Sequence, residues 1–416
     1  MHRPEGRGQS KRPGWALLRD TRFALFFMGN FLSNLGTWFQ NIAQGLLVFR
    51  LTGSPFYVGL VNFAQFAAVP VFAPLSGRLA DQYDRRRLGI LAQMVAAGTA
   101  GLLSALYFLR HLTPWRLIAG AFLLGLTNAF STPILQTVVA CLVRPQDLAA
   151  ALVMNSATYN LARAAGPVLA VLTVETAGFG WAFLINAVSF CVLAFALLRI
   201  RPQGQETHPA ASPQPSSGTP SQASVPLLLI AAGTLSVAMD PIMTLSPAFA
   251  ARVFGRPDTW AGYLVGAFGI GAIAATLRTG GMPSPRSMAL HMLVLGIGGL
   301  GFALAPSGEV GLAAAGIAGY GFLYANAGTQ TLLLLAAPPE RVGHLMGLWS
   351  VAFLGIRPVA ALADGALATL VGLRGAAVLL TFPVLGVSSW MLLHPAIPSR
   401  GHTGSRHPGG VMPQRR

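Results

Sequence analysis

The sequence predicts an all-α integral membrane protein in which twelve transmembrane helices form two pseudo-symmetric bundles of six. Three observations support this fold class. Of the 416 residues, 53% are hydrophobic and 10% are charged, whereas soluble domains carry about 25% charged residues. The hydrophobic residues gather into runs of about 20, the length of helix that crosses about 30 Å of hydrocarbon. Similar motifs also recur at corresponding places in the two halves of the chain.

Charged residues, prolines and glycines separate the predicted spans. Residues 1–22 form an N-terminal tail, and the apolar run that follows is far longer than the roughly 7–15 residues of a cleaved signal peptide. Residues 200–225, rich in Pro, Ser, Gln and Thr, are expected to be a disordered cytoplasmic linker. Residues 395–416 form a C-terminal tail. The first bundle, 23–199, has predicted spans at 23–49, 57–79, 88–109, 115–142, 150–173 and 180–198, and the second, 226–394, at 226–250, 262–277, 288–304, 311–336, 344–370 and 375–393.

The positive charge of the chain has two possible explanations. A net charge of +16 in a soluble protein would suggest a nucleic-acid partner. If the N-terminus is cytoplasmic, however, 20 basic residues fall on the cytoplasmic side, 6 fall outside and 2 lie within spans. The positive-inside rule then places both termini in the cytoplasm. We therefore expect a multi-pass protein of the inner (plasma) membrane and no nucleic-acid partner.

Several enzyme classes are excluded by motifs that the chain lacks. Its single lysine, Lys11, is followed by Arg12, so no Lys-Ser/Thr phosphate-binding loop exists and no ATPase is built in. Cys141 and Cys191 lie in apolar stretches and are interpreted as packing residues. No H-E-x-x-H or G-x-S-x-G motif occurs. The sequence predicts no enzyme activity, no metal and no cofactor.

The two halves share motifs that suggest a duplication. The segment GSPFYVGL (53–60) before the second span has a counterpart in RPDTWAGY (256–263) before the eighth. LARAAGPV (161–168) in the fifth span is echoed by LGIRPV (354–359) in the eleventh, so each half carries an arginine near mid-bilayer with a proline close behind. Duplicated halves of this kind place a substrate site between them, near the midplane.

The loop between the second and third spans reads GRLADQYDRRR at 77–87. It resembles the signature G-x-L-a-D-r-x-G-r-[RK] of the major facilitator superfamily, although Asp84 stands where that superfamily usually has Gly. With SNLGTWFQ (33–40) and NLARAAGP (160–167), the chain is similar to the branch that contains enterobactin-type exporters of drugs and siderophores. The resemblance implies a two-lobed secondary transporter that works by alternating access. It does not name a substrate.

In that superfamily, Asp and Arg residues of the signature hold the two halves together on the cytoplasmic side when the pocket faces outward. The resemblance implies this role for a cytoplasmic gate motif. A carboxylate at a helix end can pair with Arg and face the positive N-terminus of another helix, here near His344. The alternative is a solvated loop that obeys the positive-inside rule. The gate motif comprises Gly77, Asp81, Arg85, Arg86 and Arg87.

Five uncharged polar residues follow one face of the first span: Asn30, Asn34, Thr37, Asn41 and Gln44. Such groups cost free energy at membrane depth unless they meet partners or water. We expect them to line a substrate pocket, and the alternative is that they join helices by hydrogen bonds. Eight polar residues elsewhere are weaker candidates: Gln65, Asn128, Gln136, Asn155, Asn186, Tyr324, Asn326 and Gln330.

Four ionisable residues lie deep in the predicted spans: Arg163, Asp240, Arg357 and Asp364. Burial favours the neutral form of a carboxyl group, which can then exchange protons near neutral pH. Asp240, followed by Pro241, is the preferred proton-coupling candidate and Asp364 is the second, while a fixed ion pair with an arginine is the alternative. Arg357 and Asp364 stand seven residues apart, about 10 Å along a straight helix, too far for a direct pair. Both arginines are expected to bind backbone carbonyls or an anionic group of the substrate.

The combined prediction is a proton-driven efflux antiporter for a small amphipathic compound. Its partners would be protons, a small-molecule substrate and the lipid bilayer, and we expect a monomer. The direction of transport follows from the resemblance alone. An uptake permease, or a sensor that keeps the transporter fold without transport, remains an alternative. The signature and the polar face favour a working carrier.

Overall fold

The computed structural model describes residues 14–144, 147–200, 224–277, 284–337 and 341–394, and all regular secondary structure in these ranges is helical. A short 3-10 helix, Gly14–Arg19, precedes the N-terminal half, which contains α1 (Thr21–Thr52), α2 (Pro55–Gln82), α3 (Arg85–Phe108), α4 (Pro114–Leu142), α5 (Leu148–Thr176) and α6 (Phe179–Arg199). The C-terminal half contains α7 (Val225–Thr244), α8 (Ser246–Ala248), α9 (Trp260–Leu277), α10 (Pro285–Leu304), α11 (Gly308–Ala336), α12 (Val342–Ser350), α13 (Arg357–Leu370) and α14 (Gly372–Leu393).

Each predicted span coincides with one helix or with consecutive helices. Among the described residues, nine helical segments are long and apolar enough to cross a membrane, and α9 contains a shorter apolar stretch. With 32 and 29 residues, α1 and α5 are also long enough, but they carry more polar side chains. The chain is therefore a multi-pass helical membrane protein, as predicted, while the count of twelve crossings remains a prediction.

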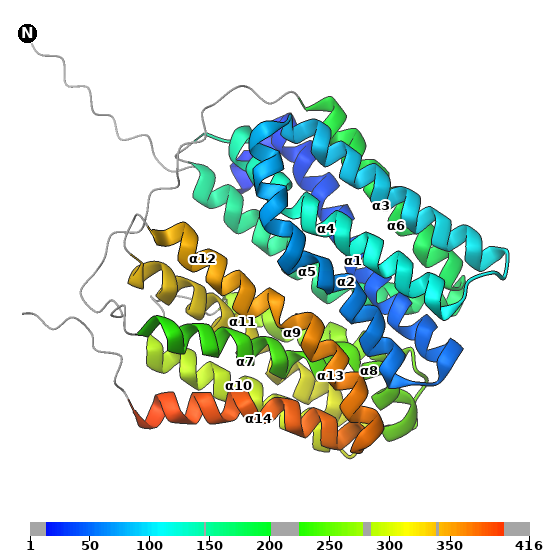
Figure 1. Ribbon diagram of the computed structural model, residues 1–416, viewed down its shortest axis with the longest axis vertical. Coiled ribbons are helices and arrows are strands. Elements are labelled where there is room, and N and C mark those ends of the chain that lie inside the picture. The colour runs from blue at the N-terminus through cyan, green and yellow to red at the C-terminus, as the bar shows by residue number, and fades with distance from the viewer. Residues whose placement is uncertain (1–13, 145–146, 201–223, 278–283, 338–340, 395–416) are drawn as a thin grey trace, which may run out of the picture.

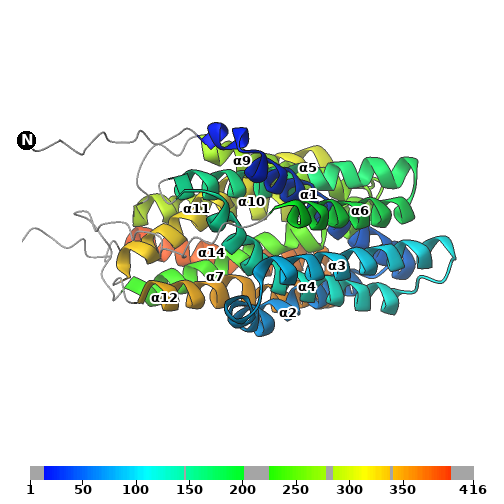
Figure 2. The ribbon, with the colours of Figure 1, turned by 90° about the horizontal axis from the view of Figure 1, so that it is seen from above.

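The two halves form separate bundles whose long helices run along a common direction (Figures 1 and 2). The C-terminal bundle has one apolar core, in which Phe249, Phe268, Phe302 and Phe322 are almost fully buried. The N-terminal bundle has two smaller cores, near its opposite ends. One of these continues across the boundary to Ala261 and Val265 of α9, so the halves share apolar contacts on that side.

The bundle has two distinct ends. We call the end that contains the C-terminus of α6 and the N-terminus of α7 the linker end, and the end that contains the turn between α1 and α2 the far end (Figure 1). The halves meet where α2 packs on α13 and α5 packs on α9. A Cβ atom on Gly59 of α2 would lie 2.4 Å from the carbonyl oxygen of Ala361, and one on Gly269 would lie 2.4 Å from Cα of Ala164. Only glycine permits backbones to approach this closely.

Helix boundaries follow from capping residues. Asp20 accepts hydrogen bonds from the backbone N–H groups at the start of α1, and Gly53 ends that helix in the left-handed conformation (φ 65°). Asp84 caps α3 by accepting from the N–H groups of Arg86 (2.9 Å) and Arg87 (3.4 Å). The departure from Gly in the signature loop therefore supplies a helix cap.

The seventh and eleventh predicted spans are not continuous α-helices. α7 passes through α8 into a π-helical turn, Phe249–Val253, and α12 is joined to α13 by another π-helical turn, Val351–Gly355. Proline lacks the N–H that the α-helical pattern needs, and Pro241, Pro247 and Pro358 lie in or beside these irregular stretches. Arg357 consequently begins a new helix at mid-span.

Candidate functional site

A small cavity of about 30 Å³ lies between the halves, which is room for about one water molecule. Helices α1 and α2 of one half and α7, α9 and α13 of the other line it. Its polar lining is Asn41, Asn62, Asp240 and Arg357, and the rings of Trp38 and Phe66 lie beside them. Two of the four predicted deep ionisable residues, Asp240 and Arg357, therefore line one cavity at the interface.

Asp240 is the centre of a polar chain that crosses the interface. The Nε atom of Arg357 lies 4.0 Å from Asp240 Oδ1, and both side chains are buried. Thr244, one helical turn along α7, donates to Asp240 Oδ2 at 3.2 Å and accepts from Asn62 Nδ2 at 3.0 Å. The Arg357 guanidinium also lies 4.1 Å from the ring centre of Phe66 on α2. The chain joins α13, α7 and α2.

Asp364 of α13 is a second carboxyl group beside Asp240. It is fully buried, and its carboxyl group lies close enough to that of Asp240 for the two groups to interact electrostatically. Neither of its oxygens receives a hydrogen bond from a donor among the described residues. Two ionised carboxylates can only accept, so a hydrogen bond between them requires one shared proton. As predicted from their spacing, Arg357 and Asp364 form no described ion pair; the arginine faces Asp240 on a different helix.

Arg163 lies on α5 in a different environment. It is 5% exposed and is surrounded by the rings of Trp38, Phe268 and Phe322, whose centres lie 5.9, 5.8 and 5.2 Å from the guanidinium carbon. It donates one long hydrogen bond, 3.3 Å, to Asn160 Oδ1, and its Nε has no partner among the described residues. No carboxylate of the described chain pairs with it.

The predicted polar face of the first span has two parts with different surroundings, and Asn41 and Gln44 form the part nearer the far end. Asn41 lines the cavity and accepts a hydrogen bond from Gln65 of α2. Gln44, one turn further, is fully buried, and neither its amide oxygen nor its nitrogen has a hydrogen-bond partner within the described part of the chain. The pocket-lining prediction therefore has structural support at Asn41.

Toward the linker end, the same face makes contacts within its own half. Asn30 donates to Asn155 Oδ1 of α5 at 2.7 Å, and Thr37 donates to the carbonyl oxygen of Ser33 at 2.9 Å. Asn34 is half-buried. The alternative interpretation, hydrogen bonding between helices, describes Asn30.

Two members of the gate motif have described side chains. Arg86 donates through Nε to the carbonyl oxygen of Leu197 at 2.6 Å, and through its second nitrogen to that of Leu198. Arg87 is exposed and lies 3.6 Å from Asp84. In this conformation, Arg86 therefore joins α3 to the end of α6 within one half and makes no described contact with the other half.

The side chains of the other gate residues lie outside the described residues. The backbone places Gly77 and Asp81 in the last turns of α2, and Arg85 at the first position of α3. All three are at the linker end. Their contacts with the C-terminal half remain a prediction.

The far end is joined by charged contacts that sequence reasoning missed. Arg50 of α1 forms a two-point ion pair with Asp258 of the C-terminal half, with Nε–Oδ2 and Nη2–Oδ1 distances of 2.6 and 2.7 Å. Arg252 donates to the carbonyl oxygen of Gly53 in the opposite direction. We call these contacts the far-end clasp. One indication of this contact was present in the sequence, since Asp258 lies in the repeated motif before the eighth span.

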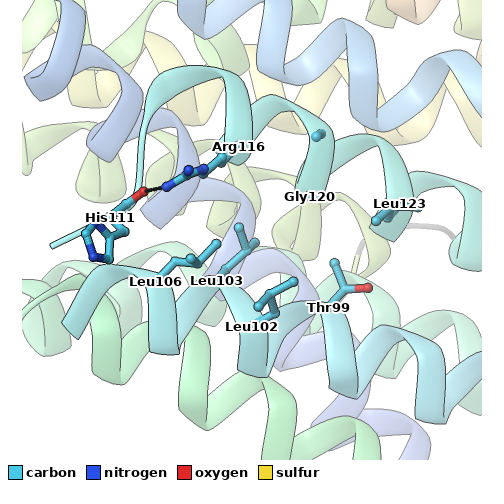
Figure 3. A pocket seen from close by; sticks show the side chains of 9 residues that line it. Thr99, Leu102, Leu103, Leu106, His111, Arg116, Gly120 and Leu123 are labelled. Atoms are coloured by element: carbon cyan, nitrogen blue, oxygen red, sulfur yellow. Dashed lines mark hydrogen bonds between the residues drawn. The ribbon is translucent and has the colours of Figure 1, made fainter. Parts of the chain in front are cut away.

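A larger hollow lies elsewhere in the described structure. A groove of about 560 Å³ runs between α3 and α4 (Figure 3), where Leu102, Leu106 and Leu123 form its apolar walls. Arg116 and His111 lie at one end, joined by a hydrogen bond from the arginine to the histidine carbonyl. The groove belongs to one half and contains no residue predicted to bind substrate or protons. It is therefore not the candidate site.

Comparisons with known proteins agree with this architecture. A family described as transmembrane secretion effector matches residues 12–400. The enterobactin exporter EntS of Shigella flexneri is 25% identical over 345 residues, covering 79% of this chain and 80% of the relative. EntS of Escherichia coli O139:H28 (strain E24377A / ETEC) is 25% identical over 353 residues with the same coverage.

Solved transporters share the fold. A POT family transporter in complex with a thioalcohol-conjugated peptide has a TM-score of 0.74 at 12% identity, covering 90% of this chain and 96% of its own. A bacterial homologue of the iron transporter ferroportin, in an inward-facing state, has a TM-score of 0.65 at 19% identity, covering 89% and 99%. These relatives are transporters and not enzymes. The chain belongs to the transmembrane secretion effector family of the major facilitator superfamily and is a multi-pass membrane transporter.

Proposed function

We propose that this transporter is a proton-coupled exporter of a small amphipathic compound that works by alternating access. The observation that supports proton coupling best is the buried group of Asp240, Asp364 and Arg357 at the interface between the halves. Intramembrane ionisable residues are costly and mark ion or proton pathways by default.

The charge of this group depends on its protons. With one proton shared between Asp240 and Asp364, one negative carboxylate balances the positive Arg357. Loss of that proton leaves one uncompensated negative charge, and a second proton leaves one uncompensated positive charge. Uncompensated charge in an apolar interior is unfavourable by several kcal/mol. Each titration step therefore favours a rearrangement that admits water or a counter-charge.

The halves can respond to this change because the group contacts both of them. Thr244 links Asp240 to Asn62 of the N-terminal half, and Arg357 lies over Phe66 of the same half. A change in the ionisation of Asp240 alters the hydrogen bond that Thr244 donates. This is a physical route from proton binding to the relative stability of the two lobe arrangements.

Export is supported by the relatives, and the described conformation is closed at the far end. If the linker end is cytoplasmic, as the positive-inside rule predicts, the far-end clasp closes the pathway to the outside in this conformation. Asn128, Thr132 and Gln136 are exposed at four-residue spacing in the linker-end half of α4. Polar side chains avoid lipid at this depth, which supports a water-filled vestibule open to the cytoplasm. The gate motif around Asp81 and Arg85 is proposed to close that end in the opposite conformation.

A cellular screen tests the direction of transport. Accumulation of a panel of antibiotics, dyes and siderophores is compared in cells with and without the protein. Lower accumulation of at least one compound supports export, higher accumulation indicates an uptake permease, and no change for any compound indicates a sensor. The compound identified in this way then serves as the transported probe in proteoliposomes.

Asp240→Asn and Asp364→Asn test the coupling. Each is expected to abolish transport driven by a pH gradient while leaving counterflow exchange between two pools of the probe. Asp84→Asn, at an exposed helix cap, is the matched control because it changes the same side chain outside the site. Gradient-driven transport at the wild-type rate in both site variants would rule out coupling through this group.

A further inference from the structure

We propose that Arg163 binds a negatively charged group of the transported molecule, and that the substrate class is therefore small organic anions with an aromatic ring. This inference rests on the proposed export function and names its substrate class. It separates the two mid-span arginines, for which the sequence suggested a common role.

The two arginines differ in their compensation. Arg357 has the carboxylate of Asp240 at 4.0 Å. Arg163, at the corresponding place in the other half, has no ion-pair partner among the described residues and only one hydrogen bond, at 3.3 Å. An unpaired cation at membrane depth is expensive to maintain. Since Arg357 is already compensated, Arg163 is the arginine that is available to an anion.

Arg163 lies on the expected path of a substrate. It projects from the N-terminal half against Phe268 and Phe322 of the C-terminal half, so it lies at the interface. Trp38 contacts Arg163 and also lines the central cavity. Tyr159, one helical turn toward the linker end, is 42% exposed and packs edge-on against Trp38 with ring centres 5.8 Å apart. A molecule entering from the linker end along α5 therefore meets Tyr159 before it reaches the guanidinium of Arg163.

The chemistry of the site selects the ligand. A guanidinium has five N–H donors in a planar fork, and a carboxylate or sulfonate can accept two of them together. The Nε of Arg163 is unpartnered, so it is free to form one arm of such a contact. The surrounding rings stabilise the cation when no anion is bound, and they offer faces and edges on which an aromatic ligand can pack.

Charge also agrees with this class. When Asp240 and Asp364 share one proton, the four deep ionisable groups carry two positive charges and one negative charge, so a bound monoanion makes the site neutral. The negative interior potential of a cell favours the outward movement of an anion. Both considerations favour an anion over a cation as the exported species.

The test uses two fluorescent probes that differ by one charged group. 1-Anilinonaphthalene-8-sulfonate is an anion, and N-phenyl-1-naphthylamine has the same rings without the sulfonate. Binding of each is measured to the full-length protein in phosphatidylcholine nanodiscs, against empty nanodiscs. Arg163→Met is compared with wild type, with Arg163→Lys as the conservative variant and Arg116→Met, in the groove between α3 and α4, as the matched control.

We expect Arg163→Met to weaken binding of the anionic probe by about 10- to 100-fold, the range for a charge-assisted hydrogen bond. The neutral probe should change by less than about twofold, and Arg163→Lys should restore part of the anion affinity. Equal weakening of both probes, no weakening of either, or no binding of the anion by wild type would overturn the proposal. If Arg163→Met does not insert, the comparison of wild type with Arg163→Lys decides, because unchanged anion affinity would exclude the fork contact.

The binding assay needs no gradient, so its outcome is independent of proton coupling. If Asp240→Asn and Asp364→Asn keep gradient-driven transport while the anion selectivity of Arg163 is found as expected, this inference stays intact and only the coupling is overturned. If Arg163→Met binds the anionic probe as wild type does while Asp240→Asn and Asp364→Asn lose gradient-driven transport, this inference is overturned and the coupling stands.

Discussion

The far-end clasp makes a quantitative prediction about the conformational equilibrium. In Asp258→Asn, Arg50 loses its carboxylate partner, and the far end should open more often. Arg50 is 44% exposed and also packs on the Phe179 ring of its own half, 5.1 Å away, so it can be hydrated and held in the variant. The substitution therefore weakens the contact between the halves and leaves the fold of each half stable.

The size of the effect follows from the geometry of the pair. Exposed ion pairs contribute about 0–1 kcal/mol, and two-point charge-assisted pairs contribute more. Asp258 is only 13% exposed, while Arg50 is nearly half exposed. We therefore expect the pair to stabilise the far-end-closed state by about 1–2 kcal/mol. This corresponds to a shift of about 5- to 30-fold in the ratio of far-end-closed to far-end-open molecules.

Spin labels can measure this ratio. Cys141 and Cys191 are first replaced by alanine, and labels are placed at Thr176→Cys and Ala251→Cys, which are exposed at the far end of opposite halves. Pulsed electron paramagnetic resonance should show a larger long-distance population in Asp258→Asn. The charge exchange Arg50→Asp with Asp258→Arg should reverse it. An unchanged distance distribution in Asp258→Asn, or a charge exchange that stays open, would refute the clasp.

Three further predictions address packing, capping and the linker. Gly59→Val places a Cβ 2.4 Å from the Ala361 carbonyl oxygen, closer than the two atoms can pack, and should force the far end open in the same distance measurement; a wild-type distribution would contradict the close approach. Asp84→Ala removes the cap of α3 and should lower stability in detergent by about 1 kcal/mol without changing transport, so an unaltered melting temperature would argue against the cap. Shortening residues 201–224 should preserve export in correctly inserted protein, and lost activity would show that this segment is more than a tether.

The sequence predicted well which residues lie deep within the spans, because this depends on the length and composition of each hydrophobic run. Each predicted span coincides with helices, and Arg163, Asp240, Arg357 and Asp364 all lie buried as expected. The interruptions of the seventh and eleventh spans were not predicted. Proline indicates a local disturbance, but its outcome as a π-helical turn depends on what packs around it.

Partners across helices could not be derived from periodicity. A helical repeat gives the face on which Asp240 lies, but it does not say which helix that face meets. Asp240 interacts with Asp364 of α13, and through Thr244 it is linked to Asn62 of α2. Of these two helices, α2 belongs to the other half of the protein. Arg86 shows the same limit, since its motif suggested a contact between halves while its described hydrogen bonds stay within one half.

The most direct test of the account is the pH dependence of the far-end distance in wild type and in the double variant Asp240→Asn/Asp364→Asn, with the same spin-label pair. The account predicts that acidification shifts the wild-type distribution, because protons bind the carboxyl pair at the interface. The double variant, which cannot titrate there, should hold at every pH the distribution that wild type reaches at low pH. A wild-type distribution that ignores pH, or a double variant that shifts with pH as wild type does, would contradict proton coupling through this site.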